Sequence, residues 1–218
     1  MPKIFRVDGW EPELSKRGFR PDEDVPDAFY RSQGAFGQLI KKSQMVRDRQ
    51  DSVIELDVLY RFEGIDVDAI ILHSQLRRKG SPVSFDFGGG DEWKPGHEES
   101  ALAALIHFGI PWLEEYSRPE KLIEYYERCL RDGIPKRSWK LPFPFKSVVI
   151  EQGPRADSNV RRPPAYHEYL AYLYRDIGDA NASRQHAHRY LETIPDNEYW
   201  TEDRGKIKRL IDSLGNDV

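Results

Sequence analysis

The sequence has little cysteine and no long apolar stretch. Its single cysteine, Cys129, cannot form a disulfide within the chain, so nothing in the composition requires an oxidising compartment. The longest uncharged run, residues 100–113, is shorter than the roughly 20 apolar residues that span a bilayer. The first residues contain no apolar segment of the kind found in secretion signals. We therefore expect a cytoplasmic protein without a membrane segment.

Positive charge is not in excess either. The 218 residues include 33 lysines and arginines against 37 acidic residues, for a net charge of −4. This balance argues against general binding to nucleic acid. Aromatic residues, in contrast, are plentiful, with 5 Trp, 11 Tyr and 10 Phe. So much apolar surface excludes a disordered chain and predicts a folded one.

Residues 53–62, VIELDVLYRF, alternate between apolar and polar side chains. A period of two is typical of a strand in a sheet with one solvated face, and it predicts that Asp57 faces solvent. Further strands are predicted at residues 27–33, 36–45, 67–76 and 82–87. Because the connections between them are too short for helical crossovers, we expect an antiparallel β-meander.

Helical periodicity follows the strands. Residues 97–108 predict a helix that ends at Gly109, and residues 119–133 predict a second helix with Cys129 on its buried stripe. Strands followed by helices indicate an α+β fold, with an antiparallel meander sheet covered by helices on one face. We expect residues 1–133 to form this domain.

The rest of the chain divides into two segments. Residues 134–164 are rich in proline and predict an extended connector, in which residues 145–152 could pair as an edge strand. Residues 165–218 predict a C-terminal appendage of three helices. The first two of these resemble a tetratricopeptide unit, although Ala187 stands where that repeat usually has a bulky residue. The matching positions are Leu170, Ala171, Tyr174, Gly178 and Pro195.

One tetratricopeptide-like unit cannot bury its own faces, and at least three are generally needed for a solenoid. A helical hairpin packed on the main domain is therefore the favoured interpretation. A peptide-binding groove of the repeat type is the alternative.

Three consecutive glycines, residues 88–90, raise the question of a phosphate-binding loop. A Walker loop needs a lysine and a hydroxyl residue at its end, whereas here Asp91 and Glu92 follow and would repel a phosphate. The run is better interpreted as a flexible strand exit. We expect no nucleotide cofactor.

Carboxylates and imidazoles gather around the glycine run. If they converged with His73, they could perform general acid–base chemistry, as in a hydrolase or nuclease-like enzyme. Their spacing matches no recognised set of metal ligands, and acidic residues at a helix start are ordinarily solvated. We therefore expect no metal site. The members besides His73 are Asp86, Asp91, Glu92, His97, Glu98 and Glu99.

Three further histidines lie in the C-terminal segment. His186 and His188 are two positions apart on a predicted helix and therefore point in different directions. His167, on the preceding helix, could join one of them, but two ligands make a weak metal site.

Between residues 131 and 162 the chain has eight basic and three acidic residues, with aromatic residues interleaved. Such a segment can anchor a partner protein or stack on bases, and we favour protein contact over nucleic acid. The favoured interpretation of the segment itself is that its aromatic residues dock the connector onto the core and its cations complement the acidic remainder of the chain. The candidate partner-binding residues are Trp139, Phe143, Phe145, Lys136, Arg137 and Lys140 from this segment and Tyr174 from the helical segment.

The order of several short motifs resembles a bacterial family, the domain-of-unknown-function family DUF 4304, over about residues 8–133. The motifs are LSKRGFR, FYR, KKSQ, ELDVLYRF and FGIPWLEEYSRPEKLIEYYE. Ser43 and Gln44 stand in the reverse of the family's usual order, and the glycine run is not a family mark. The resemblance implies an α+β fold and no established catalytic residues. Some such small bacterial domains lie near toxin genes and are thought to be immunity partners, an association that favours a binding role. We therefore expect a non-enzymatic protein-binding domain.

Overall fold

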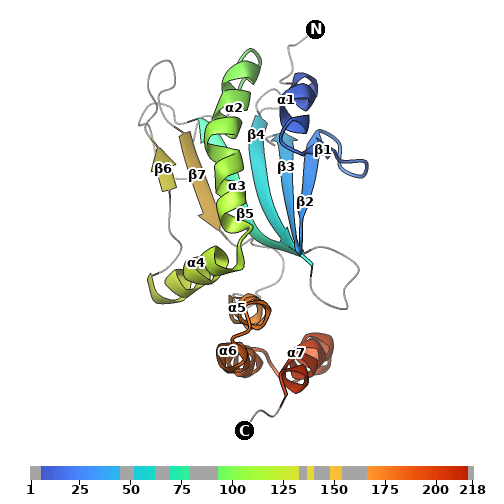
Figure 1. Cartoon of the computed structure of the whole chain (residues 1–218), viewed down its shortest axis with the longest axis vertical. Helices are drawn as coiled ribbons and strands as arrows, with labels where there is room; N and C mark the ends of the chain where they lie inside the picture. Colours follow the sequence, from blue (N-terminus) through green and yellow to red (C-terminus); the bar gives the residue numbers. More distant parts are fainter. Residues whose placement is uncertain are drawn as a thin grey trace. The chain divides into compact units, whose positions relative to one another are not determined.

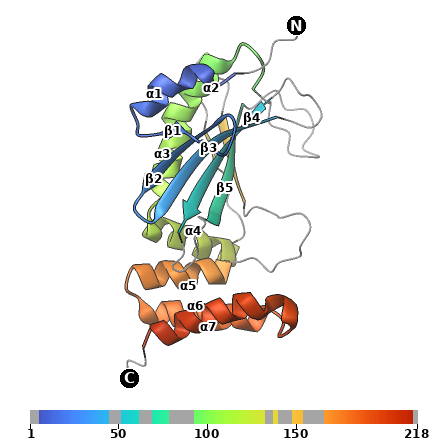
Figure 2. The same ribbon diagram turned by 90° about the vertical axis from the view of Figure 1, so that its right-hand side faces the viewer.

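The computed structural model describes residues 6–44, 52–61, 69–78, 93–132, 137–139, 148–153 and 166–215. The chain forms two compact units, drawn in Figures 1 and 2. The sheet unit comprises residues 1–117 and 135–155, and the helical unit comprises residues 118–134 and 156–218. Each unit is described by itself.

The sheet unit contains one antiparallel sheet. Its described strands are β1 (Arg20–Pro21), β2 (Ala28–Gln33), β3 (Phe36–Gln44), β4 (Ser52–Tyr60), β5 (Ala69–Arg78), β6 (Arg137–Trp139) and β7 (Val148–Gly153). They are hydrogen-bonded in the order β1-β2-β3-β4-β5-β7-β6, and every neighbouring pair is antiparallel. The first five strands follow chain order, which confirms the predicted meander. The strand expected at residues 82–87 lies outside the described residues.

Helices cover one face of this sheet. They are the short elements η1 (Asp8–Trp10) and α1 (Glu11–Ser15) and the run α2 (Glu98–Ala104), η2 (Leu105–Gly109) and α3 (Ile110–Tyr116). Figures 1 and 2 show α2 and α3 along one side of the strands. The α+β fold expected from the sequence, with an antiparallel sheet and helices on one face, is therefore confirmed.

The sequence predicted that the helix ends at Gly109, but the helical run continues through this residue. Gly109 has helical backbone angles and joins the π-helical turn η2 to α3. A Cβ atom at this position would lie 2.7 Å from Leu105 Cδ1 and 3.4 Å from Leu56 Cδ1. The glycine therefore leaves room for the buried Leu105 side chain of the same helical run, while a Cβ would only reach ordinary contact distance from β4, so it serves packing and not termination.

The alternation along β4 places its apolar residues in the core. Ile54, Leu56 and Val58 are fully buried, and Tyr60 is almost so. Asp57, expected to face solvent, is only 4% exposed. The prediction was wrong at this position because the carboxylate has a cross-strand partner, His73, which makes its burial tolerable.

The helical unit contains α4 (Pro119–Asp132), α5 (Tyr166–Asp176), α6 (Ala180–Thr193), η3 (Glu198–Trp200) and α7 (Thr201–Ser213). The helices pack in chain order, α4 on α5, α5 on α6 and α6 on α7. Gly178, with φ of +83°, makes the turn between α5 and α6. The helical spacing predicts four buried residues on α4, and Leu122, Tyr126 and Cys129 are buried, but Leu130 was predicted wrongly and is 38% exposed.

Small residues bring α5 and α6 together. Ala171 and Ala187 are fully buried, and Ser183 Oγ donates a hydrogen bond of 2.7 Å to the Ala171 carbonyl. Ala187, where the chain departs from the tetratricopeptide pattern, thus lies where the two helices come close together. A bulkier residue there would force the two helices apart.

The two compact units divide the chain differently from the sequence-based boundaries of 1–133, 134–164 and 165–218. Strands β6 and β7, from the expected connector, belong to the sheet unit, whereas α4 belongs to the helical unit. β7 pairs with both β5 and β6, so it lies inside the sheet and β6 forms the edge. Among the described residues, no helix is both long and apolar enough to cross a membrane.

Candidate functional site

The predicted partner-binding residues fall into three groups. Arg137 and Trp139 belong to β6, where they pair with Ile150 and Val148 of β7. Tyr174 lies near the end of α5 and is half-buried. The remaining predicted residues lie outside the described part of the chain, and their role stays a prediction: Lys136, Lys140, Phe143 and Phe145.

The acidic and imidazole cluster around the glycine run is only partly described. His73 on β5 stands opposite Asp57 on β4, with 2.6 Å between Nδ1 and Oδ1. The side chain of Asp57 is 6% exposed and that of His73 is 21% exposed. The alternation along residues 53–62 predicts that Asp57 faces solvent, so the sequence pattern gives no sign of this buried pair. Asp86, Asp91 and Glu92, like the glycine run 88–90, lie outside the described residues.

The remaining cluster members make local contacts at the start of α2. Glu98 Oε2 accepts a hydrogen bond of 2.7 Å from the Gly96 amide, and His97 Nδ1 accepts one of 3.3 Å from the Lys94 amide. Glu99 also lies in the first turn, where acidic residues favour the helix dipole. Convergence of the whole cluster stays a prediction.

A second polar cluster, absent from the sequence-based expectations as a set, lies inside the helical unit. His167 on α5 and His186 on α6 face each other with 2.9 Å between their Nδ1 atoms. On its other side, His186 Nε2 lies 3.1 Å from Glu127 Oε1 of α4. Tyr174 donates a 3.3 Å hydrogen bond to the same oxygen and stacks on the His186 ring. We call these four residues the histidine cluster.

Helix geometry explains why His186 and not His188 enters the histidine cluster. The two residues are separated by about 200° around α6. Accordingly, His186 is 8% exposed and lies between the buried positions Ser183 and Ala187, whereas His188 is exposed. The prediction that they cannot act together is consistent with this arrangement.

Burial controls the protonation of the pair. Desolvation is the largest cause that lowers the pKa of His186 below its ordinary value, whereas the Glu127 carboxylate acts in the opposite direction. Desolvation also lowers the pKa of His167, and the neighbouring His186 and Arg189 add to the effect. Neutral imidazoles are therefore favoured over charged ones near neutral pH.

Glu127 could not have been found from the sequence. It precedes His186 by 59 positions and sits on the flank of a helix whose buried stripe is made of other residues. No spacing motif connects it to either histidine. Within the described ranges, no group of three or more histidine, cysteine or acidic side chains could hold a metal ion.

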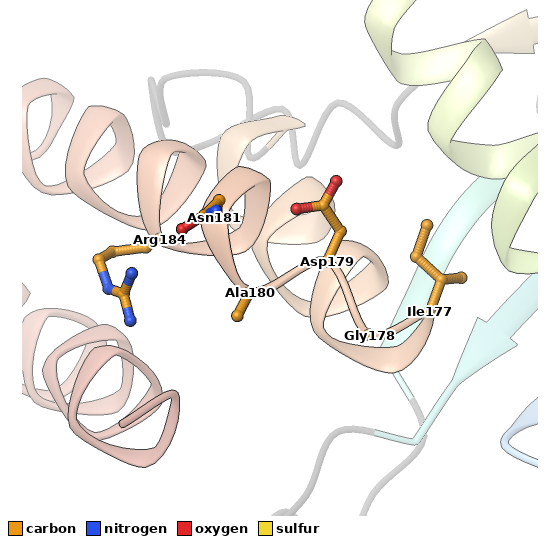
Figure 3. A pocket seen from close by; sticks show the side chains of 6 residues that line it. All are labelled: Ile177, Gly178, Asp179, Ala180, Asn181 and Arg184. Atoms are coloured by element: carbon orange, nitrogen blue, oxygen red, sulfur yellow. The ribbon is translucent and has the colours of Figure 1, made fainter. Parts of the chain in front are cut away.

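A cavity of about 420 Å³ opens at the turn between α5 and α6 (Figure 3). Two of its charged side chains, Asp179 and Arg184, already have partners. Asp179 Oδ1 accepts from the Ala182 amide and caps α6, and Arg184 donates to the Gly215 carbonyl at 2.6 Å. The full lining is Ile177, Gly178, Asp179, Ala180, Asn181 and Arg184.

The histidine–carboxylate contacts given above thus lie in two places, the Asp57–His73 pair of the sheet unit and the histidine cluster of the helical unit. In comparisons with known proteins, no family model, no curated protein and no solved structure matches this chain.

Proposed function

We propose that this chain is a non-enzymatic protein-binding module and that its helical unit supplies the contact surface. The observation that carries the proposal is the packing of α4, α5, α6 and α7 in chain order. Helices stacked in this way leave a continuous side of the layer available to a partner, which is how helical-repeat proteins bind. The α5–α6 hairpin, with its tetratricopeptide-like spacing, lies in the middle of this layer.

Exposed apolar side chains support the same assignment. Among the described residues, the large hydrophobic side chains that are exposed are Leu130 (38%), Ile177 (42%) and Tyr199 (65%). All three belong to the helical unit: Leu130 lies on α4, Ile177 directly follows α5, and Tyr199 lies in η3. Aromatic and aliphatic anchors of this kind contribute most of the binding energy in protein interfaces.

The process in which this module acts follows from the family resemblance alone. The motifs that resemble DUF 4304 support a role as an immunity-type or regulatory protein. Such a protein would act by binding another protein. Partner contact by the basic and aromatic residues between positions 136 and 145 stays a separate prediction from the sequence.

Site-specific photo-crosslinking in the native host tests this proposal. A photoreactive amino acid replaces Tyr199 or Ile177 in the intact chain, and a matched control carries it at Ala35, an exposed position of the sheet unit. We expect one crosslinked partner from Tyr199 or Ile177 and none from Ala35.

A second pair of variants shows whether the apolar contacts matter. Ile177→Asp and Tyr199→Asp change exposed positions, so unfolding temperatures should stay close to that of the parent chain. Loss of the crosslinked partner in these variants supports the proposal. Crosslinks of equal yield from all three positions, or unchanged capture by both variants, contradict it.

A second candidate function is hydrolysis by the Asp57–His73 pair together with the predicted acidic cluster. The favouring observation is the 2.6 Å contact, since a carboxylate that orients an imidazole is a common way to prepare a general base. Phosphodiester and ester substrates would be assayed with the intact chain, His73→Gln, and His107→Gln as a control from the same unit. Activity lost only in His73→Gln would favour this candidate over the binding module.

A further inference from the structure

The two histidines of the histidine cluster meet through atoms that cannot both be protonated. Their Nδ1 atoms are 2.9 Å apart, a hydrogen-bond distance, and the ring centroids are 5.1 Å apart. An imidazole nitrogen donates when it carries a proton and accepts when it does not, whereas a charged imidazolium only donates. The observed contact therefore requires that at least one of the two Nδ1 atoms be unprotonated.

Glu127 determines which nitrogen accepts. An ionised carboxylate has no proton to donate, so the 3.1 Å contact with Glu127 Oε1 is donated by His186 Nε2. A neutral His186 then presents a lone pair at Nδ1, and His167 Nδ1 must donate to it. The neutral cluster is thus a directed chain of hydrogen bonds from His167 through His186 to Glu127.

One additional proton is compatible with this chain, and two are not. A proton on His167 Nε2 leaves its Nδ1–H donor in place. A second proton, on His186 Nδ1, puts two N–H groups face to face and two like charges in contact. The charged groups that act on the pair are Glu127 on α4 and Arg189 and Glu192 on α6. The Tyr174 ring on α5, which stacks on His186, leaves that imidazole little room to turn away.

We propose that the His167–His186 contact is a proton-operated switch that loosens the packing of α5 on α6 when the surroundings become acidic. The inference concerns the helical unit alone and does not rest on protein binding. The cluster connects all three helices, because each contributes a side chain to it. Breaking the central contact therefore releases the tie between α5 and α6, whereas His186 keeps its Nε2–H donor to Glu127 on α4.

The direction of the effect follows from the protonation balance. Both pKa values are lowered from the ordinary 6.5, mainly by burial, so below that pH the unfolded chain takes up more protons than the folded one. The stability of the helical unit is then full above about pH 6.5 and decreases as the pH falls toward the folded pKa values. The opening equilibrium gains up to about tenfold per pH unit for each proton taken up.

The test combines two measurements on the intact chain between about pH 8 and about pH 5. Imidazole nitrogen shifts report the titration of each histidine by NMR. Amide hydrogen exchange, corrected for its intrinsic pH dependence, reports opening of α5 and α6. We expect the pKa of His186 to lie below the ordinary value of 6.5 and the exchange of α5 amides to rise as His186 takes up its proton.

Three variants identify the cause. His167→Gln and His186→Gln remove the titrating groups, and His188→Gln is the control from the exposed face of the same helix. The acid-dependent opening should be lost in the first two variants and kept in the third. If either variant fails to fold, the titration of the unmodified chain still decides the matter. Independent titration of His167 and His186 at the ordinary value, or acid opening that persists in both variants, overturns the proposal.

Discussion

Gln38 on β3 donates a 2.8 Å hydrogen bond from Nε2 to Ser117 Oγ, just after α3. Gln38 is fully buried, and its Oε1 accepts from Arg31 Nε at 2.9 Å. Ser117 in turn donates to the Leu113 carbonyl at 2.7 Å. One side-chain amide therefore satisfies polar groups on a neighbouring strand and at the helix end.

Replacement of Gln38 by leucine should destabilise the sheet unit. The change leaves the Ser117 hydroxyl and part of the Arg31 guanidinium without their buried partner, which costs about 1–3 kcal/mol. Chemical denaturation followed by tryptophan fluorescence measures the loss. Gln185→Leu, at an exposed position of α6, is the control and should stay within about 0.5 kcal/mol of the parent chain. Equal stability of both variants would show that the network contributes nothing.

Two glycine-to-alanine changes should act in opposite directions. Alanine is favoured over glycine within helices by about 1 kcal/mol. At Gly109 that gain is outweighed, because the new Cβ would lie 2.7 Å from Leu105 Cδ1 in a fully buried environment. Overpacking of this kind costs about 1–3 kcal/mol, so we expect net destabilisation.

Gly205, within α7, provides the matched comparison. A Cβ there has its nearest neighbour, the flexible end of Arg209, at 3.5 Å. Gly205→Ala should therefore stabilise the helical unit by about 0.5–1 kcal/mol. Thermal unfolding, with separate probes for the two units, measures both changes. Stabilisation by both variants would contradict the close approach at Gly109.

Glu127→Gln should make the two histidines harder to protonate. The Glu127 carboxylate acts to raise the pKa of His186 and of His167, and a neutral amide lacks that charge while it can still accept a hydrogen bond. Both pKa values should thus fall below those of the parent chain, as an NMR titration would show. Glu120→Gln, exposed on the same helix, should leave them unchanged. A rise in either pKa would contradict the assigned contact.

Cys129 should be a slow thiol in the folded chain. Burial raises the pKa of this thiol, although a hydrogen bond with Tyr125 partly opposes the effect, and the residue is 6% exposed. The thiolate is the reactive form, so alkylation near neutral pH should be slow and should keep accelerating as the pH rises toward and beyond 9.0. Denaturant provides the control, because it should make labelling rapid. Immediate labelling of the folded chain would show that the thiol is accessible.

The sequence predicted most of the secondary structure because it depends on local periodicity. The expected strand at residues 53–62 is observed as β4, and the expected helix at 119–133 as α4. Helix termination at Gly109 was predicted wrongly, because the backbone stays helical there and the missing Cβ leaves room for the buried Leu105 side chain.

The candidate sites were harder to predict because they depend on tertiary contacts, which local periodicity does not reveal. His167 and His186 could be placed on adjacent helices from the sequence, but their contact depends on how closely Ala171, Ser183 and Ala187 let those helices approach. Glu127 and Asp57 are recruited across elements far apart in the chain, so only the folded structure identifies them.

The order of elements along the chain has a consequence for synthesis. α4 leaves the ribosome before β6 and β7, yet it belongs to the unit that is completed only by α5, α6 and α7. The apolar stripe of α4 must wait for about the last quarter of the chain, and β5 must wait for a neighbour made after α4. Neither unit can therefore finish folding during translation as a contiguous stretch, and a nascent chain stalled after residue 132 would expose both an open strand edge and an uncovered helix to chaperones.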